Sequence, residues 1–149
     1  MKSYKYFLFS LLILLTVGCN SDDPIPVNNN NNDTVPNVTN PITGRVWMDR
    51  NLGAIRVATS SIDDFSYGHL YQWGRSNDGH EVRTSGISDT LSNINAPESG
   101  DFIFTSQSPH DWLSPQNDNL WQGINGVNNP CPEGYRIPTQ AEWDEERAS

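Results

Sequence analysis

Aromatic side chains, more than aliphatic ones, have to build the core of this chain. All five tryptophans among its 149 residues lie between positions 41 and 149, where aliphatic residues are few. Each aromatic side chain in a core removes about 150–250 Å² of surface from water. Gly, Pro, Asn, Asp and Ser are frequent in the same stretch, and these residues favour turns. The sequence therefore predicts one domain over residues 41–149, with an aromatic core and long loops.

Two segments of this domain carry the pattern of extended structure. Arg45 to Asp49 reads as a strand that follows a turn at Thr43 and Gly44. The stretch 67–74 alternates Tyr, His, Tyr and Trp, which predicts a second extended segment, although one turn of helix fits as well. Residues 76–116 are polar, and we expect them to be mostly irregular.

The last residues carry a helix start signal. Thr139 and Glu142 have the spacing of a capping box, in which each side chain satisfies a backbone N–H at the start of the helix. Trp143 stands at the position of a hydrophobic staple, with Pro138 or Ile137 as its apolar partner. The helix is predicted to run from Gln140 to the end of the chain, because no stop signal interrupts it.

The amino terminus has the layout of an export signal. Lys2 and Lys5 precede eleven mostly apolar residues, Phe7 to Val17, which are too few to span a bilayer. The small residue Gly18 directly before Cys19 resembles a lipobox, the site where bacterial lipoproteins are diacylated and cleaved. Residues 1–18 are therefore predicted to be a lipoprotein signal peptide and Cys19 the lipidated residue. The alternative is an ordinary signal peptide with an incidental cysteine.

Residues 19–40 are predicted to be a disordered tether. They include five consecutive asparagines and no aromatic residue, so they cannot bury enough apolar area to offset the entropy of ordering. The acidic start, Asn20 to Asp23, resembles the surface-export signal of Bacteroidetes lipoproteins, and a generic solvated run is the alternative. We expect an outer membrane location with the domain exposed at the cell surface. Thr34 and Thr90 each fit an Asp-Thr-aliphatic O-glycosylation motif.

The charge of the chain limits the molecules that it can bind, and its cysteine count limits the disulfides that it can form. Without residues 1–18, seven arginines and no lysine remain against eighteen acidic residues, so we expect no nucleic-acid partner. The expected partners are a membrane, held through the lipid, and a glycan or protein ligand. If Cys19 carries the lipid, Cys131 has no partner within this chain.

Four blocks of the domain, 44–54, 67–75, 119–123 and 129–139, resemble the Fibrobacter succinogenes major paralogous domain (FISUMP) family. The resemblance covers residues 43–149 and implies an α+β fold, a partial C-type-lectin-like domain related to formylglycine-generating enzymes. Domains of that family continue past the helix and contain a further cysteine. The resemblance therefore implies a truncated copy, the N-terminal part of a domain, in which the natural partner of Cys131 is missing.

We expect this domain to bind a ligand, and we expect no enzyme activity and no cofactor. A formylglycine-generating oxidase needs a cysteine pair in the C-terminal half, so that function is a remote alternative. The three histidines, 11 and 30 residues apart, lack the spacing of a helical metal motif. The Asn- and Asp-rich turns at 117–119 and 128–129 could supply calcium ligands, but turn formation explains them as well.

Trp121 is the tryptophan that we expect to contact a ligand, because the sequence that flanks it is polar and rich in glycine. The sequence thus predicts a non-enzymatic, surface-anchored lipoprotein with a lectin-like module for display or for binding a glycan or protein. The main alternative is a structural or adhesin-type component of a cell-surface assembly.

Overall fold

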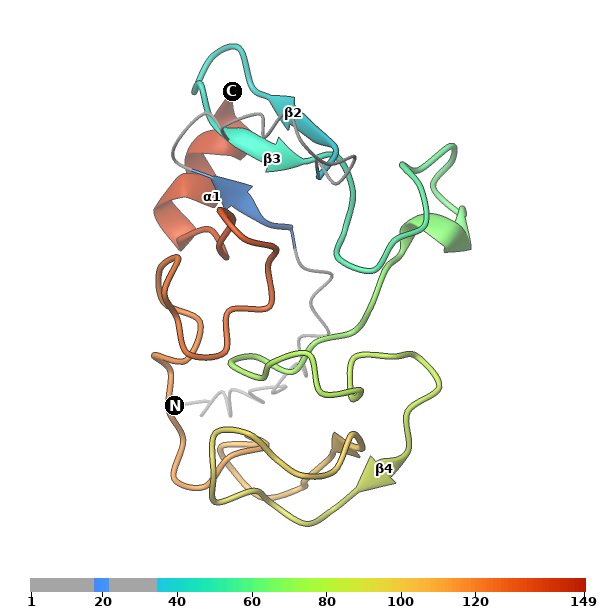
Figure 1. Ribbon diagram of the computed structural model, residues 1–149, viewed down its shortest axis with the longest axis vertical. Helices are drawn as coiled ribbons and strands as arrows, with labels where there is room; N and C mark the ends of the chain where they lie inside the picture. Colours follow the sequence, from blue (N-terminus) through green and yellow to red (C-terminus); the bar gives the residue numbers. More distant parts are fainter. Residues whose placement is uncertain (1–17, 22–34) are drawn as a thin grey trace, which may run out of the picture.

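The computed structural model describes residues 18–21 and 35–149. Within them it is a small mixed domain of short strands, one α-helix and long loops, which is compatible with an α+β class (Figure 1). The elements in chain order are β1 (Asn20–Ser21), β2 (Asn37–Thr39), β3 (Val46–Met48), the 3-10 turn η1 (Asp64–Ser66), β4 (Ile87–Ser88), β5 (Phe102–Ile103) and α1 (Gln140–Ala148).

The main sheet is antiparallel, with β3 between β1 and β2. Trp47 at the centre of β3 pairs with Asn20 on one side and with Val38 on the other. The predicted strand after Gly44 is therefore present, and Gly44 has the positive φ of 73° that the turn requires. The other edge of β1 pairs with Arg136, since the backbone N–H and C=O groups of Asn20 and Arg136 exchange two hydrogen bonds of 2.9 Å.

Helix α1 lies beside this sheet and begins as predicted (Figure 1). The Thr139 side chain accepts a hydrogen bond from the Glu142 backbone N–H, and the Glu142 carboxylate accepts one of 2.7 Å from the Thr139 backbone N–H. No residue of α1 is buried. The helix is held instead by an edge-on contact between the Trp143 and Trp47 rings, 5.4 Å apart, and by ion pairs.

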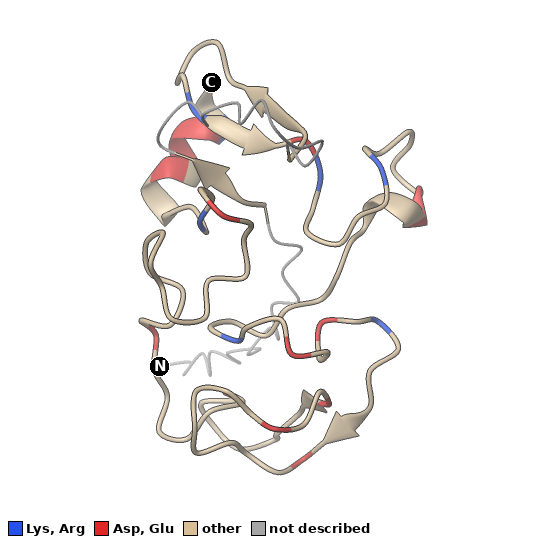
Figure 2. Cartoon of the chain, in the orientation of Figure 1, with Lys and Arg blue, Asp and Glu red and all other residues tan. Residues whose placement is uncertain are grey.

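Glu142 is the centre of those ion pairs. Its carboxylate accepts hydrogen bonds from the guanidinium groups of Arg136, at 2.8 Å, and Arg45, at 3.1 Å. The hydrogen bonds from Arg136 are the main reason that the pKa of Glu142 falls to about 2. Acidic side chains are frequent along α1, as Figure 2 shows. The helix is thus joined to the sheet by charge more than by apolar burial.

The prediction that residues 19–40 form a disordered tether is wrong at both ends of that segment. Residues 20–21 form β1 and residues 37–39 form β2, so the described parts of 19–40 belong to the folded sheet. Backbone hydrogen bonds to β3 supply the stabilisation that this polar sequence cannot obtain by apolar burial. Residues 22–34 and the predicted signal peptide up to residue 17 lie outside the described residues.

The second predicted extended segment, 67–74, contains no named strand in the part that the structure describes. Its aromatic residues also do not share one face, because Tyr71 is buried and Trp73 is 48% exposed. Residues 76–116 are mostly irregular, as predicted, apart from the short parallel pair of β4 and β5.

Two apolar clusters form the core. The first consists of Cys19, Leu52, Tyr71, Trp121 and Tyr135, and Met48 of β3 packs against it. The second lies under the loops and consists of Ile103, Trp112, Leu113 and Leu120. Aromatic rings thus occupy much of the core, as the composition indicated, although leucine contributes to both clusters. Among the described residues no helix combines the length and the hydropathy needed to cross a membrane.

Candidate functional site: a tryptophan-lined groove

A groove of about 710 Å³ runs between the loop at 118–123 and the start of α1. Its volume is in the range of pockets that bind small ligands. Its walls combine three tryptophans with polar side chains and glycines, and they are formed by Gly18, Trp73, Asp118, Trp121, Gln122, Gly123, Arg136, Ile137, Pro138, Thr139, Gln140 and Trp143.

The exposed aromatic surface of this groove belongs to Trp73 and Trp143, which are 48% and 45% exposed. Trp121, the predicted ligand contact, borders the groove as well, but its side chain is only 2% exposed and belongs to the core. Its contact with a ligand stays a prediction. Its ring packs edge-on against Tyr71, and its indole N–H donates to the Arg75 backbone C=O at 3.1 Å. The polar neighbours of Trp121 face solvent while its ring points inward, and no local pattern reveals this direction.

Trp73 rests on Trp121, with ring centroids 5.0 Å apart and planes inclined by 54°. One ring is thus fixed in the core and supports the other at the groove wall. The Trp73 backbone is fixed as well, since its C=O accepts a hydrogen bond of 2.7 Å from the Trp112 indole N–H. Trp73 is therefore a rigid, half-exposed aromatic surface, whose flat face can stack on an apolar ring face at little cost in conformational entropy.

Polar groups of the groove complement these rings. Asp118, Gln122 and Gln140 bring carboxylate and amide groups that can donate to or accept from hydroxyl groups. The Arg136 guanidinium is largely neutralised by the Glu142 carboxylate. The groove therefore offers stacking faces and hydrogen bonds with little unbalanced positive charge.

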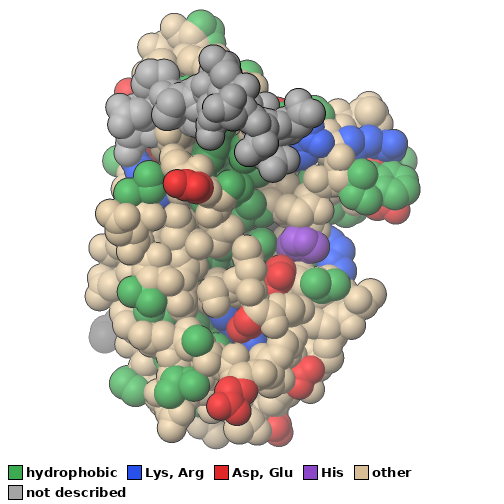
Figure 3. Space-filling view, viewed as in Figure 1, with side chains coloured by type: hydrophobic (Ala, Val, Ile, Leu, Met, Phe, Trp, Pro, Cys, Tyr) green, Lys and Arg blue, Asp and Glu red, His purple; other side chains and the backbone are tan. Residues whose placement is uncertain are grey.

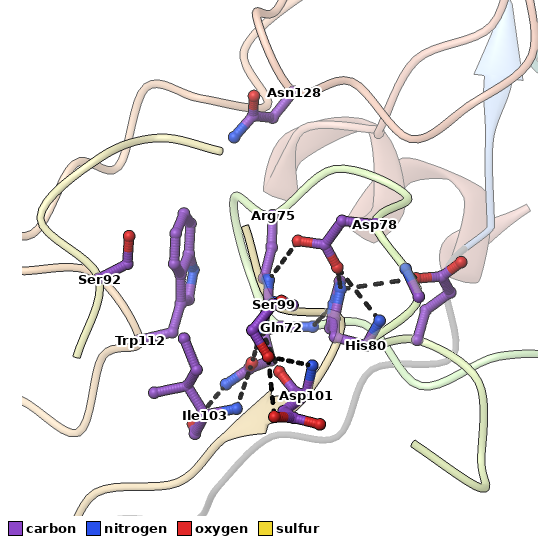
Figure 4. A network of polar contacts seen from close by, with 12 residues as sticks. Gln72, Arg75, Asp78, His80, Ser92, Ser99, Asp101, Ile103, Trp112 and Asn128 are labelled. Atoms are coloured by element: carbon purple, nitrogen blue, oxygen red, sulfur yellow. Dashed lines mark hydrogen bonds and ion pairs between the residues drawn. The ribbon is translucent and has the colours of Figure 1, made fainter. Parts of the chain in front are cut away.

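The side of the groove that carries Trp73 is held by a buried arginine, shown in Figure 4. The Arg75 side chain is fully buried, and its guanidinium donates to the Asp78 carboxylate at 2.7 Å and to the Gln72 side chain at 2.8 Å. It also donates to the backbone C=O groups of Ser99, at 2.7 Å, and Asp101, at 2.8 Å. We call these contacts the Arg75 network. A buried charge is tolerated when its donors are satisfied in this way.

The network continues beyond Arg75. The Gln72 side chain donates to the Ile103 C=O and accepts from the Ile103 N–H, so it pairs with β5 like a strand. The Asn128 side chain donates to the C=O groups of Gly74, at 2.8 Å, and Asn95, at 2.7 Å. Side chains thus satisfy backbone groups that regular secondary structure satisfies in other proteins.

Asp78, His80 and Glu81 are close enough to suggest a metal site, with ligand atoms within 4.8 Å of one another. However, His80 Nδ1 lies 2.7 Å from the Asp78 carboxylate, and His80 Nε2 accepts from the Gln72 backbone N–H at 3.1 Å. Both ring nitrogens are therefore engaged, and the side chain is fully buried. Burial lowers the pKa of His80, which favours the neutral ring that these contacts require. This arrangement is structural, and no ligand atom of His80 is available.

Asp78 completes that arrangement. Burial raises the pKa of its carboxyl, but hydrogen bonds from the His80 backbone N–H and the Arg75 guanidinium outweigh burial, so the pKa is lowered. Asp78 is therefore ionised and neutralises Arg75. Of the other two histidines, His69 makes an edge-on contact with Tyr71, and His110 is exposed on a loop. The Asn117 side chain accepts from the Asn119 backbone N–H, the geometry of an Asx turn.

Cys19 and Cys131 form a disulfide across 112 positions of the sequence. Cys131 therefore has a partner in this chain, contrary to the expectation that its partner is missing. One sulfur cannot hold both this disulfide and a lipid, so lipidation of Cys19 stays a prediction for a different state of the chain. Of the predicted O-glycosylation sites, Thr90 is exposed, and Thr34 lies outside the described residues.

The visible surface of the molecule is mixed in character. On the face in Figure 3, hydrophobic side chains form small groups separated by polar atoms, and basic side chains are also dispersed.

No family model, curated protein or solved structure matches the chain. The groove therefore has to be interpreted from its own residues.

Proposed function

We propose that this chain is a non-enzymatic lipoprotein of the outer membrane, exposed at the cell surface, whose domain binds a glycan in the tryptophan-lined groove. The observation that carries the binding function is the groove itself, with Trp73 and Trp143 each about half exposed beside amide and carboxylate groups. Planar aromatic faces match the C–H faces of sugar rings, and the polar groups around them match hydroxyls.

The anchoring part of the proposal is supported by the sequence. A basic start, eleven mostly apolar residues, Gly18 and Cys19 follow one another in the order of a lipoprotein signal. Two acyl chains on one cysteine hold a protein stably at a bilayer, whereas one chain does so only marginally. We also propose kinship with the FISUMP family and a lectin-like fold. The strand at 46–48 and the turn at 132–135 fall within the blocks of that resemblance, and the capped helix begins directly after the last block.

The non-enzymatic part is supported by the chemistry of the buried polar cluster. A general acid or base must reach the proton that it transfers, and both nitrogens of the buried His80 ring are engaged within the protein. In the disulfide form neither cysteine offers a thiolate. In the lipid-bearing form only Cys131 would remain as a thiol, which is fewer than the cysteine pair that a copper-dependent oxidase of the formylglycine-generating class needs.

A glycan array, followed by titration of the full-length protein with the strongest oligosaccharide, tests the binding function. Trp73→Ala removes the supported stacking face and is expected to weaken binding at least tenfold, and Trp143→Ala is expected to act in the same direction. Phe104→Ala is the matched control, because Phe104 is 51% exposed but does not line the groove. Binding that survives Trp73→Ala and Trp143→Ala unchanged would contradict the groove as the site.

Trp121→Ala is not a suitable probe of this site, because it removes a core ring. Its expected effect is a loss of stability of about 3–5 kcal/mol, as for other buried tryptophans. Loss of binding in that variant would report unfolding, so it must be accompanied by a denaturation curve.

A further inference from the structure

Cys19 has two competing uses for one sulfur atom. The sequence predicts a thioether to a lipid, whereas the structure joins the same sulfur to Cys131. Each chain can therefore contain one of these bonds but not both. The surroundings of Cys19 decide what else must change when the lipid is the one that forms.

Cys19 is fully buried, in the cluster that contains Leu52, Tyr71, Trp121 and Tyr135. Protein cores are packed to the density of organic crystals, so even a few added methylene groups force displacement. Two acyl chains on the Cys19 sulfur cannot be accommodated there. Residues 19–21 must leave this position when Cys19 carries the lipid.

The segment that leaves is β1, which is bound on both of its edges. The Cys19 C=O accepts from the Met48 N–H of β3 at 3.0 Å, and Asn20 exchanges two hydrogen bonds with Arg136. The position of Asn20 is energetically unfavourable. Its side chain is fully buried, and neither polar atom of its amide has a hydrogen-bond partner. Such an orphaned amide regains hydrogen bonds to water when β1 leaves, which favours the departure.

We propose that the protein has two exclusive forms, set by the chemical state of Cys19. In the closed form Cys19 is bonded to Cys131 and β1 is in the sheet. In the open form Cys19 carries the lipid, β1 has left its slot between β3 and Arg136, and Cys131 is a free thiol. The open form rests on the proposed lipid anchor, while the closed form is the structure described above.

Both covalent steps balance with reagents of the cell envelope. In the closed form two thiols lose two protons and two electrons to a disulfide-containing oxidant, which is reduced to two thiols. In the open form the Cys19 thiol displaces the headgroup phosphate of a glycerophospholipid. A carbon–sulfur bond forms, a carbon–oxygen bond breaks, and the proton leaves with the headgroup phosphate.

The test uses the full chain, expressed in a bacterium that processes lipoproteins. Membrane and soluble fractions are denatured, alkylated without a reductant and weighed by intact mass spectrometry. Every lipid-bearing chain is expected to take up one alkyl group, on Cys131. Every lipid-free chain is expected to take up none before reduction and two after it. Lipid-bearing chains in which Cys131 is not alkylated would overturn this proposal and leave the anchor intact, whereas a complete absence of lipid-bearing chains would overturn both.

Hydrogen exchange tests the structural half of the proposal. In lipid-bearing protein the backbone N–H groups of Arg136 and Met48 are expected to exchange at least tenfold faster than in the disulfide form, because their partners in residues 19–20 have left. The Asn128 N–H, bonded to the Leu120 C=O, is the internal control and is expected to be unchanged. Equal protection of Arg136 and Met48 in the two forms would show that β1 stays in place and would overturn the proposal.

Cys19→Ser separates the two uses of the sulfur. This variant has neither lipid nor disulfide, so every chain is expected to take up one alkyl group on Cys131. Exchange at Arg136 in the variant then shows whether β1 needs the covalent bond to remain in the sheet. Protection equal to that of the closed form would show that loss of the disulfide alone leaves β1 bound, and the faster exchange expected in the open form is then attributable to the lipid.

Discussion

Two regions of this molecule satisfy their polar groups in different ways. The sheet–helix region, residues 18–21, 35–48 and 131–149, is held by short strands, a capped helix, partly exposed ion pairs and one disulfide. The loop region, residues 72–128, has only β4 and β5 as named strands and is held by the Arg75 network together with the apolar cluster of Ile103, Trp112, Leu113 and Leu120. A buried charged side chain can thus take the place of a sheet in satisfying the polar groups of loops, and much of the stability of these loops then depends on one residue.

The largest loss of stability is expected when Arg75, the centre of the Arg75 network, is replaced. Arg75→Met leaves the Asp78 carboxylate and the Ser99 and Asp101 C=O groups without their donor, and is expected to lower the free energy of unfolding by about 3–5 kcal/mol. Urea denaturation followed by tryptophan fluorescence measures it. Arg147→Met is the matched control, because Arg147 is 72% exposed and lies 3.9 Å from Asp144. A cost below about 1 kcal/mol for Arg75→Met would refute the idea that one residue organises the loops.

The sheet–helix region has the disulfide as its counterpart. In lipid-free protein, Cys131→Ser is expected to lower the free energy of unfolding by about 2–4 kcal/mol, because the bond closes a long loop in the unfolded chain. Hydrogen exchange should show lost protection in residues 19–21 and 135–137 first, with the loop region less affected. The control is the original protein with a reductant, which should match the variant. Uniform loss of protection would indicate that the two regions unfold as one unit.

A smaller effect isolates the helix. Thr139→Ala removes the side-chain cap of α1 and is expected to cost about 1 kcal/mol, measured by the same denaturation. Thr90→Ala, at an exposed loop position, is the matched control and should change stability by less than about 0.5 kcal/mol. If the two variants behave alike, α1 is not held by its cap.

Acid is expected to act on the two regions in different pH ranges. Burial lowers the pKa of His80 in the loop region, so the unfolded chain binds a proton at about pH 6.5 while the folded chain resists it. Stability from this residue is therefore lost as the pH falls below 6.5. Glu142 in the sheet–helix region has a pKa of about 2, so its contribution is lost only as the pH falls from about 4.5 towards 2.

Melting temperatures measured between pH 7 and pH 3 test this order. His80→Gln is expected to flatten the dependence between pH 7 and pH 5, whatever its effect on stability at pH 7, because the group that titrates there has been removed. Glu142→Gln should leave the slope between pH 7 and pH 5 unchanged and reduce it below pH 4.5. A slope above pH 5 that persists in His80→Gln would assign the acid response to another group.

Local patterns in the sequence predicted the local structure. Thr139 and Glu142 lie three residues apart, so the capping box involves only neighbouring backbone and is readable from the sequence. The turn at Gly44 and the strand after it are local in the same sense. The aromatic character of the core followed from composition, because few other large apolar side chains were present.

The tertiary structure alone decided which side chains face inward and which distant segments meet. Trp73 and Trp121 both lie in polar, glycine-containing segments, yet contacts with Tyr71 and Arg75 bury Trp121, while Trp73 is exposed at the groove wall. The pairing of Cys19 with Cys131 and the burial of Arg75 likewise depend on segments far apart in the chain. The physical reason is the distance along the chain over which each interaction acts. A cap or a turn is made by residues close in sequence, whereas burial, disulfide pairing and a paired internal charge depend on the packing of the whole domain.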